Sequence, residues 1–339
     1  MPTSSSLNRR TALEFATMSA IATVTGASCA QAQSNATVPS NVSLAHVNPP
    51  ASPLPHRTCD CHVHIFNPAR FPYVNERSYT PGTATVEDLL AFEGRLGVDR
   101  VVLVQPSGYG TDNRCLVDAL AQLGPRRARG VAVIDLEQTT TKEIGALHES
   151  GVRSIRLNLE VKGEHSVERS RATLRRALQL VAPTSWSIQI YADMALIEGL
   201  AAEIRSAKVP VVLDHFAGLK ADKGMAQAGW STLLVLLREG RVYVKLSAPY
   251  RASKLADYGD LAPFARAFAE AAPGRLVWAS DWPHTGSSSN RSGDLSVVEP
   301  FRAINGGVIL DQLRSWVPDQ AIQHQILVTN PAELYSFGE

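Results

Sequence analysis

The sequence has almost no excess of charge of either sign. Its 33 Lys and Arg residues face 32 Asp and Glu residues, which gives a formal net charge of +1. Binding to a polyanion usually needs a basic face, so we expect no nucleic-acid partner. Short repeats are also absent, and the hydrophobic content of 45% is too high for a disordered or collagen-like protein. The length fits one large domain or two smaller ones.

The sequence also lacks an apolar run long enough to span a bilayer. The apolar stretch near its start, Ala12 to Ala27, is too short. This stretch follows the pair Arg9-Arg10 and precedes Ala30-Gln31-Ala32, which is an A-x-A cleavage pattern. We therefore expect residues 1–32 to be a twin-arginine signal peptide and the protein to be exported to the periplasm. The alternative is an amphipathic helix of the mature protein.

Cysteine is scarce, with four residues in the chain. Cys29 is not expected to carry a lipid anchor, because the large aliphatic residue usual three positions earlier is missing. Cys59 and Cys61 lie two apart on an expected strand, near the upper Cα separation of a relaxed disulfide. We expect these two residues and Cys115 to be buried free thiols.

The segment 33–57 is rich in Pro, Asn, Ser and Ala and has no helical or strand periodicity. We expect a flexible tether there, followed by a single domain over residues 58–339.

Short β-branched runs alternate with helical patterns from Cys59 onward. The expected strands are Cys59–Ile65, Arg100–Gln105, Gly130–Asp135, Arg153–Asn158, Ser187–Ala192, Val209–Asp214, Val242–Ser247 and Arg275–Ser280. Eight strand–helix units in about 250 residues are typical of a (β/α)8 TIM barrel. The alternative is an open doubly wound sheet, which usually has a Gly-rich phosphate loop after its first strand, whereas this first strand ends in histidines. We therefore expect an α/β fold of the TIM-barrel type.

Several intervening segments have recognisable helix ends. Thr85 and Asp88 resemble a capping box, and Gly97 would end the same helix. Further helices are expected at 113–123, 166–182, 193–207 and 257–272, where apolar residues recur three and four positions apart.

Reactive side chains recur where the expected strands end. In a TIM barrel the active site lies at the carboxyl ends of the strands and in the loops that follow. The residues at these positions are His62, His64, Ser107, Arg156, Tyr191, His215, Arg251 and Asp281. This regularity predicts one site built from most of the strands.

The first strand contains the stretch Asp60-Cys61-His62-Val63-His64. A period of two would place Asp60, His62 and His64 on one face and the residues between them on the other. Two imidazoles on the inner face of a barrel can share one metal ion or one substrate carbonyl. The alternative is a pair of structural histidines that hydrogen-bond within the fold.

A family resemblance covers about residues 58–338. It rests on His62-Val63-His64, on Asp214-His215, on Ser280-Asp281-Trp282-Pro283-His284 and on the terminal Asn330-Pro331-Ala332-Glu333-Leu334-Tyr335. These motifs resemble the amidohydrolase superfamily and its amidohydrolase-2 branch. The segments 77–81, 105–113 and 214–218 resemble most the pyrone-dicarboxylate lactonases and sulfomuconolactonases of that branch. The resemblance implies a hydrolase of lactone esters, with a role in the catabolism of aromatic compounds.

The resemblance also bears on metal binding. Two-metal members of the superfamily have a bridging lysine at the fourth strand and a histidine at the fifth, whereas this chain has Arg156 and Gln189 in these regions. We therefore expect no binuclear centre. The resembled pyrone-dicarboxylate lactonases work without metal, and sulfomuconolactonases are associated with zinc. We expect no obligatory cofactor; the alternative is one zinc ion held by His62, His64 and Asp281.

Cations near the expected barrel mouth indicate an anionic substrate. Arg156, Arg251 and Lys162 would lie together there if the strand assignment holds. An arginine fork pairs with a carboxylate through two hydrogen bonds, so several cations at one pocket favour a dicarboxylate lactone. The family has a second arginine near Lys162, and lysine keeps the charge without the fork. The alternative for each cation is a surface salt bridge.

The residue types predict a mechanism of hydrolysis. Asp281 would take a proton from water, while His62, His64 and His215 stabilise the oxyanion of the attacked ester. The substrate would be oriented by Tyr79, Ser107 and Tyr191. One alternative is a zinc-dependent decarboxylase of an aromatic or enol acid. Another is a non-catalytic periplasmic protein that binds carboxylates, which would not need the aspartate and histidines together.

Overall fold

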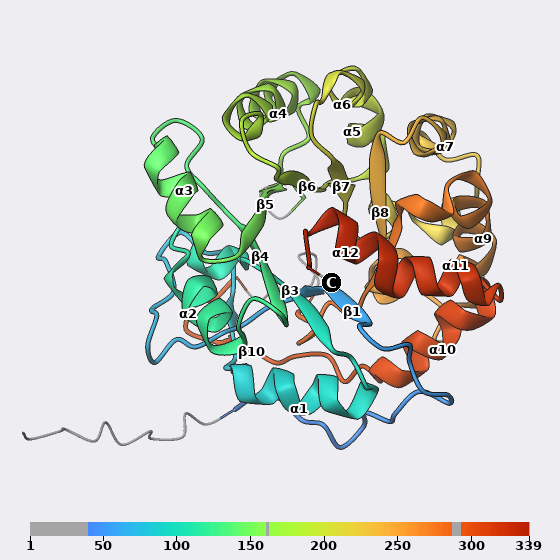
Figure 1. Cartoon of the computed structure of the whole chain (residues 1–339), viewed down its shortest axis with the longest axis horizontal. Coiled ribbons are helices and arrows are strands. Elements are labelled where there is room, and N and C mark those ends of the chain that lie inside the picture. The colour runs from blue at the N-terminus through green and yellow to red at the C-terminus, as the bar shows by residue number, and fades with distance from the viewer. Residues whose placement is uncertain (1–39, 161–162, 287–292, 339) are drawn as a thin grey trace, which may run out of the picture. The chain divides into compact units, whose positions relative to one another are not determined.

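The protein is described by a computed structural model over residues 40–160, 163–286 and 293–338. Eight parallel strands form one sheet in which neighbours in sequence are neighbours in space. The helices surround this sheet (Figure 1). The expected (β/α)8 barrel is therefore confirmed. The predicted signal peptide, residues 1–32, lies outside the described residues.

All eight strands lie within two residues of their expected starts. They are β1 (Cys59–Val63), β3 (Arg100–Val104), β4 (Ala128–Ala132), β5 (Val152–Asn158), β6 (Ser187–Tyr191), β7 (Val211–Leu213), β8 (Val242–Ser247) and β9 (Leu276–Ala279). Two further short strands, β2 (Thr80–Pro81) and β10 (Val298–Glu299), pair with each other in parallel. The barrel strands are buried on both faces because helices cover the outside.

The barrel closes between its first and last strands. The amide of His64 donates to the carbonyl of Trp282 over 2.9 Å, and the amide of Asp281 donates to the carbonyl of His62 over 3.1 Å. A buried carboxylate reinforces this seam, because Asp60 Oδ1 accepts from the amides of His62 at 3.1 Å and Ser280 at 3.0 Å. The seam places the histidines of β1 beside the residues that follow β9.

Strand β1 does not keep the strict alternation expected from its sequence. Its register against β3 shifts between Asp60 and Val63, as at a β-bulge. Cys59 and Cys61 pack together inside the barrel, with their sulfur atoms 3.8 Å apart. Asp60 instead contacts the side chain of Glu93 on the first helix. The expectation that Asp60 shares a face with the two histidines is therefore wrong, and the irregularity in the strand is the reason.

The helices follow the predicted pattern with two differences. They are α1 (Val86–Leu96), α2 (Arg114–Leu123), α3 (Thr141–Glu149), α4 (Val167–Val181), α5 (Met194–Gly199), α6 (Ala201–Ser206), α7 (Trp230–Arg238), α8 (Pro249–Ala252), α9 (Ala262–Ala271), α10 (Gly306–Trp316), α11 (Gln320–His324) and α12 (Asn330–Leu334). The capping box of Thr85 and Asp88 is present at the start of α1, and Gly97 ends it in the left-handed conformation. The helix expected over 193–207 is divided at Leu200 into α5 and α6. The helix expected over 257–272 begins only at Ala262.

The carboxyl terminus covers the amino ends of the barrel strands. Tyr335 and Phe337 pack against Cys59 and Cys61 inside the barrel, and α12 lies near the centre of the ring in Figure 1. At the start of β3, the Arg100 guanidinium donates to the carbonyl of Gly338 over 2.9 Å. The opposite end of the barrel is therefore the one that remains for a site. In the described part of the chain, no helix is long and apolar enough to cross a membrane.

Residues 40–57 run along the barrel, although the sequence assigns them to a tether. Val47 is buried, and the amide of Asn41 donates to the carbonyl of Thr83 over 2.9 Å. Further along, the amide of Ala51 donates to the carboxylate of Asp311 on α10. These contacts with the barrel explain why the segment has a defined path despite its lack of periodicity. Residues 33–39 lie outside the described residues.

Candidate active site

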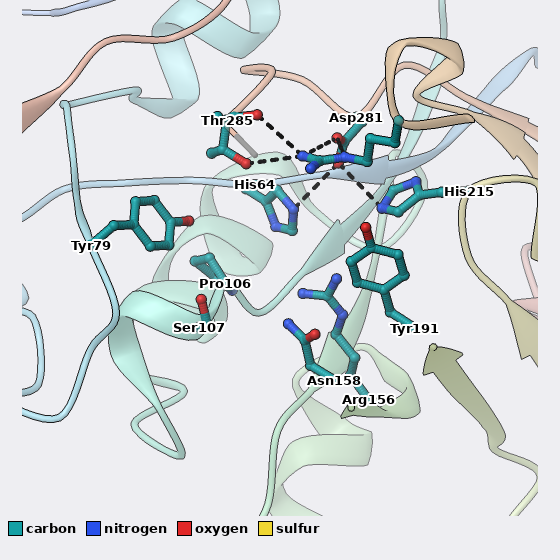
Figure 2. Close-up of a pocket in the computed structure, with 12 residues that line it drawn as sticks. His64, Tyr79, Pro106, Ser107, Arg156, Asn158, Tyr191, His215, Asp281 and Thr285 are labelled. Carbon is teal, nitrogen blue, oxygen red and sulfur yellow. Dashed lines mark hydrogen bonds and ion pairs between the residues drawn. The ribbon is translucent and has the colours of Figure 1, made fainter. Parts of the chain in front are cut away.

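The sequence-predicted site residues meet at the carboxyl end of the barrel. One pocket there is lined by His64, Tyr79, Pro106, Ser107, Arg156, Asn158, Tyr191, His215, Arg251, Asp281, Thr285 and Gly286. Figure 2 shows Tyr79 and Ser107 on one side of this pocket and Arg156, Asn158 and Tyr191 on another, below His64, His215 and Asp281. Lys162, also predicted to bind substrate, lies outside the described residues.

Three imidazoles surround one oxygen of a buried carboxylate. Asp281 Oδ1 lies 3.6 Å from His62 Nε2, 3.7 Å from His64 Nε2 and 3.8 Å from His215 Nε2. All four side chains are almost completely buried. The histidines come from β1 and the end of β7, and the aspartate follows β9, so three parts of the barrel build this cluster.

The other oxygen of Asp281 is anchored by hydrogen bonds. Asp281 Oδ2 accepts from the Tyr250 hydroxyl at 2.8 Å and from Arg251 Nε and Nη2 at 3.0 and 2.9 Å. Burial raises the pKa of Asp281, but the Arg251 guanidinium and the histidines outweigh it, so the net pKa lies well below its usual value. Asp281 is therefore ionised, with Oδ1 aimed at the histidines and available to accept a proton.

The backbone is strained at two of these residues. His215 has φ 51° and Asp281 has φ 64°, a left-handed conformation that is uncommon for residues other than glycine. Each of them lies just past the end of a barrel strand. Such strain is found at sites where the fold must direct a side chain into a pocket, which is where both side chains lie.

The histidines differ in the partners of their Nδ1 atoms. His64 Nδ1 lies 2.7 Å from the carbonyl oxygen of Val104. Since a carbonyl only accepts, His64 carries a proton on Nδ1. His215 Nδ1 lies 2.9 Å from the Ser247 hydroxyl. Burial lowers the pKa of His215 to about 4 and that of His62 well below its usual value, with the Lys245 ammonium as the second cause. His62 and His215 are therefore neutral near pH 7.

Arg156 is a cation that lines the pocket and has unused hydrogen-bonding capacity. It lies near the end of β5 and is buried. Its closest charged partner is Asp214, with 3.6 Å between Arg156 Nη2 and Asp214 Oδ2. Among the residues that the structure describes, none accepts a hydrogen bond from Arg156 Nε. A buried guanidinium with unused donors is suited to a carboxylate ligand.

A buried polar layer lies behind the histidines. Asp214 Oδ2 accepts from Gln189 Nε2 at 2.8 Å, and Lys245 Nζ donates to Gln189 Oε1 at 2.7 Å. Burial raises the pKa of Asp214, but the Lys245 ammonium and the neighbouring histidines together outweigh burial, so the pKa lies well below its usual value. The sequence analysis missed Lys245, Ser247 and Tyr250. The one available signal was a lysine inside the apolar strand Val242–Ser247.

The pocket at the cluster is small. It encloses about 30 Å³, which is room for a few water molecules at most. Ser107, Arg156 and Asn158 also line a neighbouring cavity of about 350 Å³ that reaches the apolar side chains of Leu136 and Leu157. This size falls in the range of ligand pockets, so space for a ring-shaped ligand lies beside Arg156.

The donor set also fits one metal ion. Three possible ligand atoms, from His62, His215 and Asp281, lie within 4.8 Å of one another. His64 Nε2 lies 3.2 Å from His62 Nε2, close to the separation of about 3.3 Å expected between two ligands of tetrahedral zinc. His64 lies next to this group, but His215 takes the place that the sequence analysis gave to His64 in the expected set of His62, His64 and Asp281. The regions of β5 and β6 where two-metal relatives hold further ligands are occupied here by Arg156 and Gln189, and Gln189 is bound to Asp214 and Lys245.

Comparisons with known proteins give a family match and several relatives. The amidohydrolase family (amidohydrolase-2 type) matches residues 59–337. A 4-sulfomuconolactone hydrolase of Rhizobium radiobacter is 34% identical over 285 residues, which cover 83% of this chain and 91% of the relative. A 2-pyrone-4,6-dicarboxylate hydrolase of Comamonas testosteroni is 30% identical, over 86% of this chain and 94% of the relative.

A solved structure extends the likeness to the fold. A probable 2-pyrone-4,6-dicarboxylic acid hydrolase of Acinetobacter baumannii, crystallised with citric acid bound, superposes with a TM-score of 0.69 at 27% identity. The match covers 83% of this chain and all of that protein. With the family match over most of the chain, the barrel and the site at its carboxyl end, these findings show that the chain belongs to the amidohydrolase family.

Proposed function

We propose that the chain is a hydrolase that opens a carboxylated lactone such as a pyrone dicarboxylate. The observation that carries this proposal is the arrangement of Asp281. One of its oxygens is fixed by Tyr250 and Arg251, and the other faces three imidazoles. This arrangement can activate water beside a polarised carbonyl. The relatives named as lactone hydrolases support the same class of reaction.

Substrate binding begins with the carboxylates. Arg156 Nε has no acceptor among the described residues, and Arg156 lines both the pocket at the aspartate–histidine cluster and the larger neighbouring cavity. One substrate carboxylate would pair with Arg156. Tyr79, Ser107, Asn158 and Tyr191 line the same pocket and would orient the ring. Arg251 is already bound to Asp281, so its main role is to position the carboxylate, and a substrate contact is secondary. Lys162 stays a proposed ligand of a second carboxylate.

In the hydrolytic step, a carboxylate oxygen and an imidazole nitrogen of the cluster accept hydrogen bonds from water. A water molecule donates one hydrogen bond to Asp281 Oδ1 and one to His64 Nε2, which carries no proton when the ring is neutral because Nδ1–H is bound to Val104. Asp281 takes a proton as the water oxygen attacks the ester carbonyl. His62 and His215 face the developing oxyanion. The ring C–O bond then breaks, and the proton passes from Asp281 to the leaving oxygen.

We propose that no metal ion is obligatory for this step. The support is that the Arg251 guanidinium and the Tyr250 hydroxyl hold Asp281 Oδ2, so that side chains of this chain already orient the carboxylate. His62, His215 and Asp281 would hold a zinc ion, which would supply Lewis acidity that polarises the carbonyl.

The test is a substrate panel assayed on one preparation. Pyrone dicarboxylate and muconolactone analogues should be hydrolysed, with ring opening followed by loss of the lactone absorbance. Turnover should persist in protein that has been treated with a chelator and that holds less than one metal ion per chain by metal analysis. Release of carbon dioxide would establish decarboxylation instead, and failure to open any carboxylated lactone would refute the proposal.

We further propose that the protein acts in the periplasm. The support is the order of Arg9-Arg10, an apolar stretch and Ala30-Gln31-Ala32, which matches a twin-arginine signal.

A further inference from the structure

A second cavity lies beside the catalytic pocket. Residues between 41 and 47 form one wall of this cavity, and residues 282–284, residues 301–304 and Phe92 of α1 form the other. Among the residues that the structure describes, none lines both this cavity and the catalytic pocket. The cavity encloses about 190 Å³, and an engineered apolar cavity of about 150 Å³ already binds benzene. It is therefore large enough for one small ring-shaped ligand.

A buried imidazole in this cavity has unused hydrogen-bonding groups. His284 lines the cavity and is 3% exposed. Neither Nδ1 nor Nε2 has a hydrogen-bond partner in the described part of the chain. Burial lowers the pKa of His284 to about 3, so near pH 7 the neutral ring has one N–H donor and one lone pair. Buried polar groups are rarely left unbonded because this costs free energy, and a ligand in the cavity would supply a partner.

A guanidinium adds positive charge to the same cavity. Arg302 lines the cavity, and its buried Nε donates to no described residue. The amide of Arg302 donates to the carbonyl of His284 over 2.9 Å, which ties the two residues together. The guanidinium also lies over the ring of Tyr250, 5.2 Å from its centroid. None of the described lining residues carries a carboxylate, so the cavity favours an anion.

The rest of the lining is largely apolar. Phe92 and Trp282 lie with their ring centroids 6.1 Å apart, and Phe301 lines the same cavity. On the opposite wall, Leu44 and Val47 of the amino-terminal segment line the cavity. Such walls stabilise a ligand that buries apolar surface against them. An inorganic anion alone would leave them without contacts.

We propose that this cavity is a second ligand site, which binds a small carboxylate with an apolar body about the size of one ring. The carboxylate accepts hydrogen bonds from Arg302 Nε and from the N–H of His284. The segment 41–47 covers the ligand, which gives this segment a role in binding. Tyr250 contacts both sites, since its hydroxyl donates to Asp281 and its ring packs against Arg302. The proposal does not depend on the lactone hydrolysis proposed above.

The test is calorimetry of the full chain with benzoate as the probe. Because Arg156 is itself proposed to bind a carboxylate, the measurement is made in Arg156→Met, where the catalytic pocket has lost that guanidinium. Benzoate should still bind this variant saturably. Adding Arg302→Met should weaken binding about 10- to 100-fold, the size expected for one hydrogen bond to a charged group. Adding Arg153→Met instead removes the same charge elsewhere and should leave the affinity unchanged.

Two results would overturn the proposal. One is the absence of saturable benzoate binding in Arg156→Met, which would assign any wild-type binding to the catalytic pocket. The other is an equal loss of affinity on adding Arg302→Met or Arg153→Met, which would leave only a general effect of charge.

Two further ligands test the proposed chemistry. Benzamide keeps the ring and loses the negative charge, whereas acetate keeps the charge and loses the ring. Each should bind at least about 10-fold more weakly than benzoate. Benzamide binding as tightly as benzoate would refute the role of the charge. Acetate binding as tightly would refute the role of the apolar walls.

A second measurement locates the ligand and needs no variant of Arg302. Nitrogen-15 spectra of Arg156→Met labelled at histidine are recorded during a benzoate titration, with the His284 signals assigned from His284→Gln. The His284 signals should shift with the same midpoint as the calorimetric binding. Shifts at His64 and His215, which line the catalytic pocket, with none at His284 would overturn the proposal, whatever the outcome of the substrate panel.

Discussion

Replacing Arg156 by methionine tests the substrate-binding half of the proposed function. The side chain keeps much of its apolar length, and the guanidinium is lost. Asp214, the carboxylate nearest to Arg156, keeps its hydrogen bond from Gln189 and its ion pair with Lys245. The fold should therefore tolerate the change, and its effect should fall on ligand binding.

The size of the effect follows from the unused donors. A hydrogen bond to a charged group contributes about 1.5–3 kcal/mol, and a guanidinium can give a carboxylate two such bonds. The lower end of that range gives about 3 kcal/mol for the pair, which is a loss of about 100-fold in kcat/KM. Since Arg156 contacts no reacting atom in this scheme, the loss should appear mainly in KM.

The assay pairs the variant with a change in the substrate. Wild type and Arg156→Met are compared on a dicarboxylate lactone and on the same lactone lacking one carboxylate. If Arg156 holds that carboxylate, the arginine and carboxylate deletions should be far from additive, with a coupling of about 2–3 kcal/mol. Arg153→Met removes the same charge from the start of β5, where Arg153 is bound to the carbonyls of His148 and Val152, and should leave KM unchanged. Losses of equal size on all lactones would refute the reasoning.

Four other predictions address the cluster, its surroundings and export. Asp281→Asn should lower kcat by about 10²- to 10⁴-fold with a cooperative thermal transition retained; substantial remaining hydrolysis would exclude Asp281 as the base. Tyr250→Phe removes one of the hydrogen bonds on Asp281 Oδ2 and should lower kcat/KM about 10-fold, whereas unchanged kinetics would mean that Arg251 alone positions the carboxylate. Burial lowers the pKa of His284 from 6.5 to about 3, so the stabilisation of its neutral ring is complete above pH 6.5 and is lost as the pH falls. Unfolding by urea should show that His284 contributes about 2 kcal/mol to the loss of stability between pH 7 and 5. His284→Gln should therefore lose about 2 kcal/mol less than wild type over the same interval, and an equal loss in both proteins would contradict the lowered pKa of His284. Replacing Arg9 and Arg10 by lysine should leave the protein in the cytoplasmic fraction, and an unaltered periplasmic yield would reject the twin-arginine route.

Much of the fold could be predicted because its signals are local. The capping box at Thr85 and the β-branched run at Val242–Ser247 depend only on residues near each other in sequence. The irregularity in β1 could not be predicted, since it depends on pairing with β3 and on the contact between Asp60 and Glu93. The path of residues 40–57 is also set by distant partners such as Asp311.

The candidate site could be predicted where reactive side chains lie at or just after the end of a strand. His62, His64, His215 and Asp281 all lie there, and the barrel brings them together. The hydrogen bonds that orient these residues were not predictable. Nothing near Tyr250 in the sequence indicates that its hydroxyl donates a hydrogen bond to Asp281. The partners of Lys245 come from three other strands or their ends.

The seam between β1 and β9 has a consequence for the order in which the protein becomes active. His62 and His64 lie on the first strand and Asp281 follows the last, and Asp60 joins the two through the amides of His62 and Ser280. During synthesis, the histidines emerge long before the aspartate that they must face. A chain that has folded only its first seven strands has no base for the reaction, however compact it is. Recovery of activity during refolding should therefore report the meeting of the first and last strands, and it should lag behind signals of collapse or helix formation.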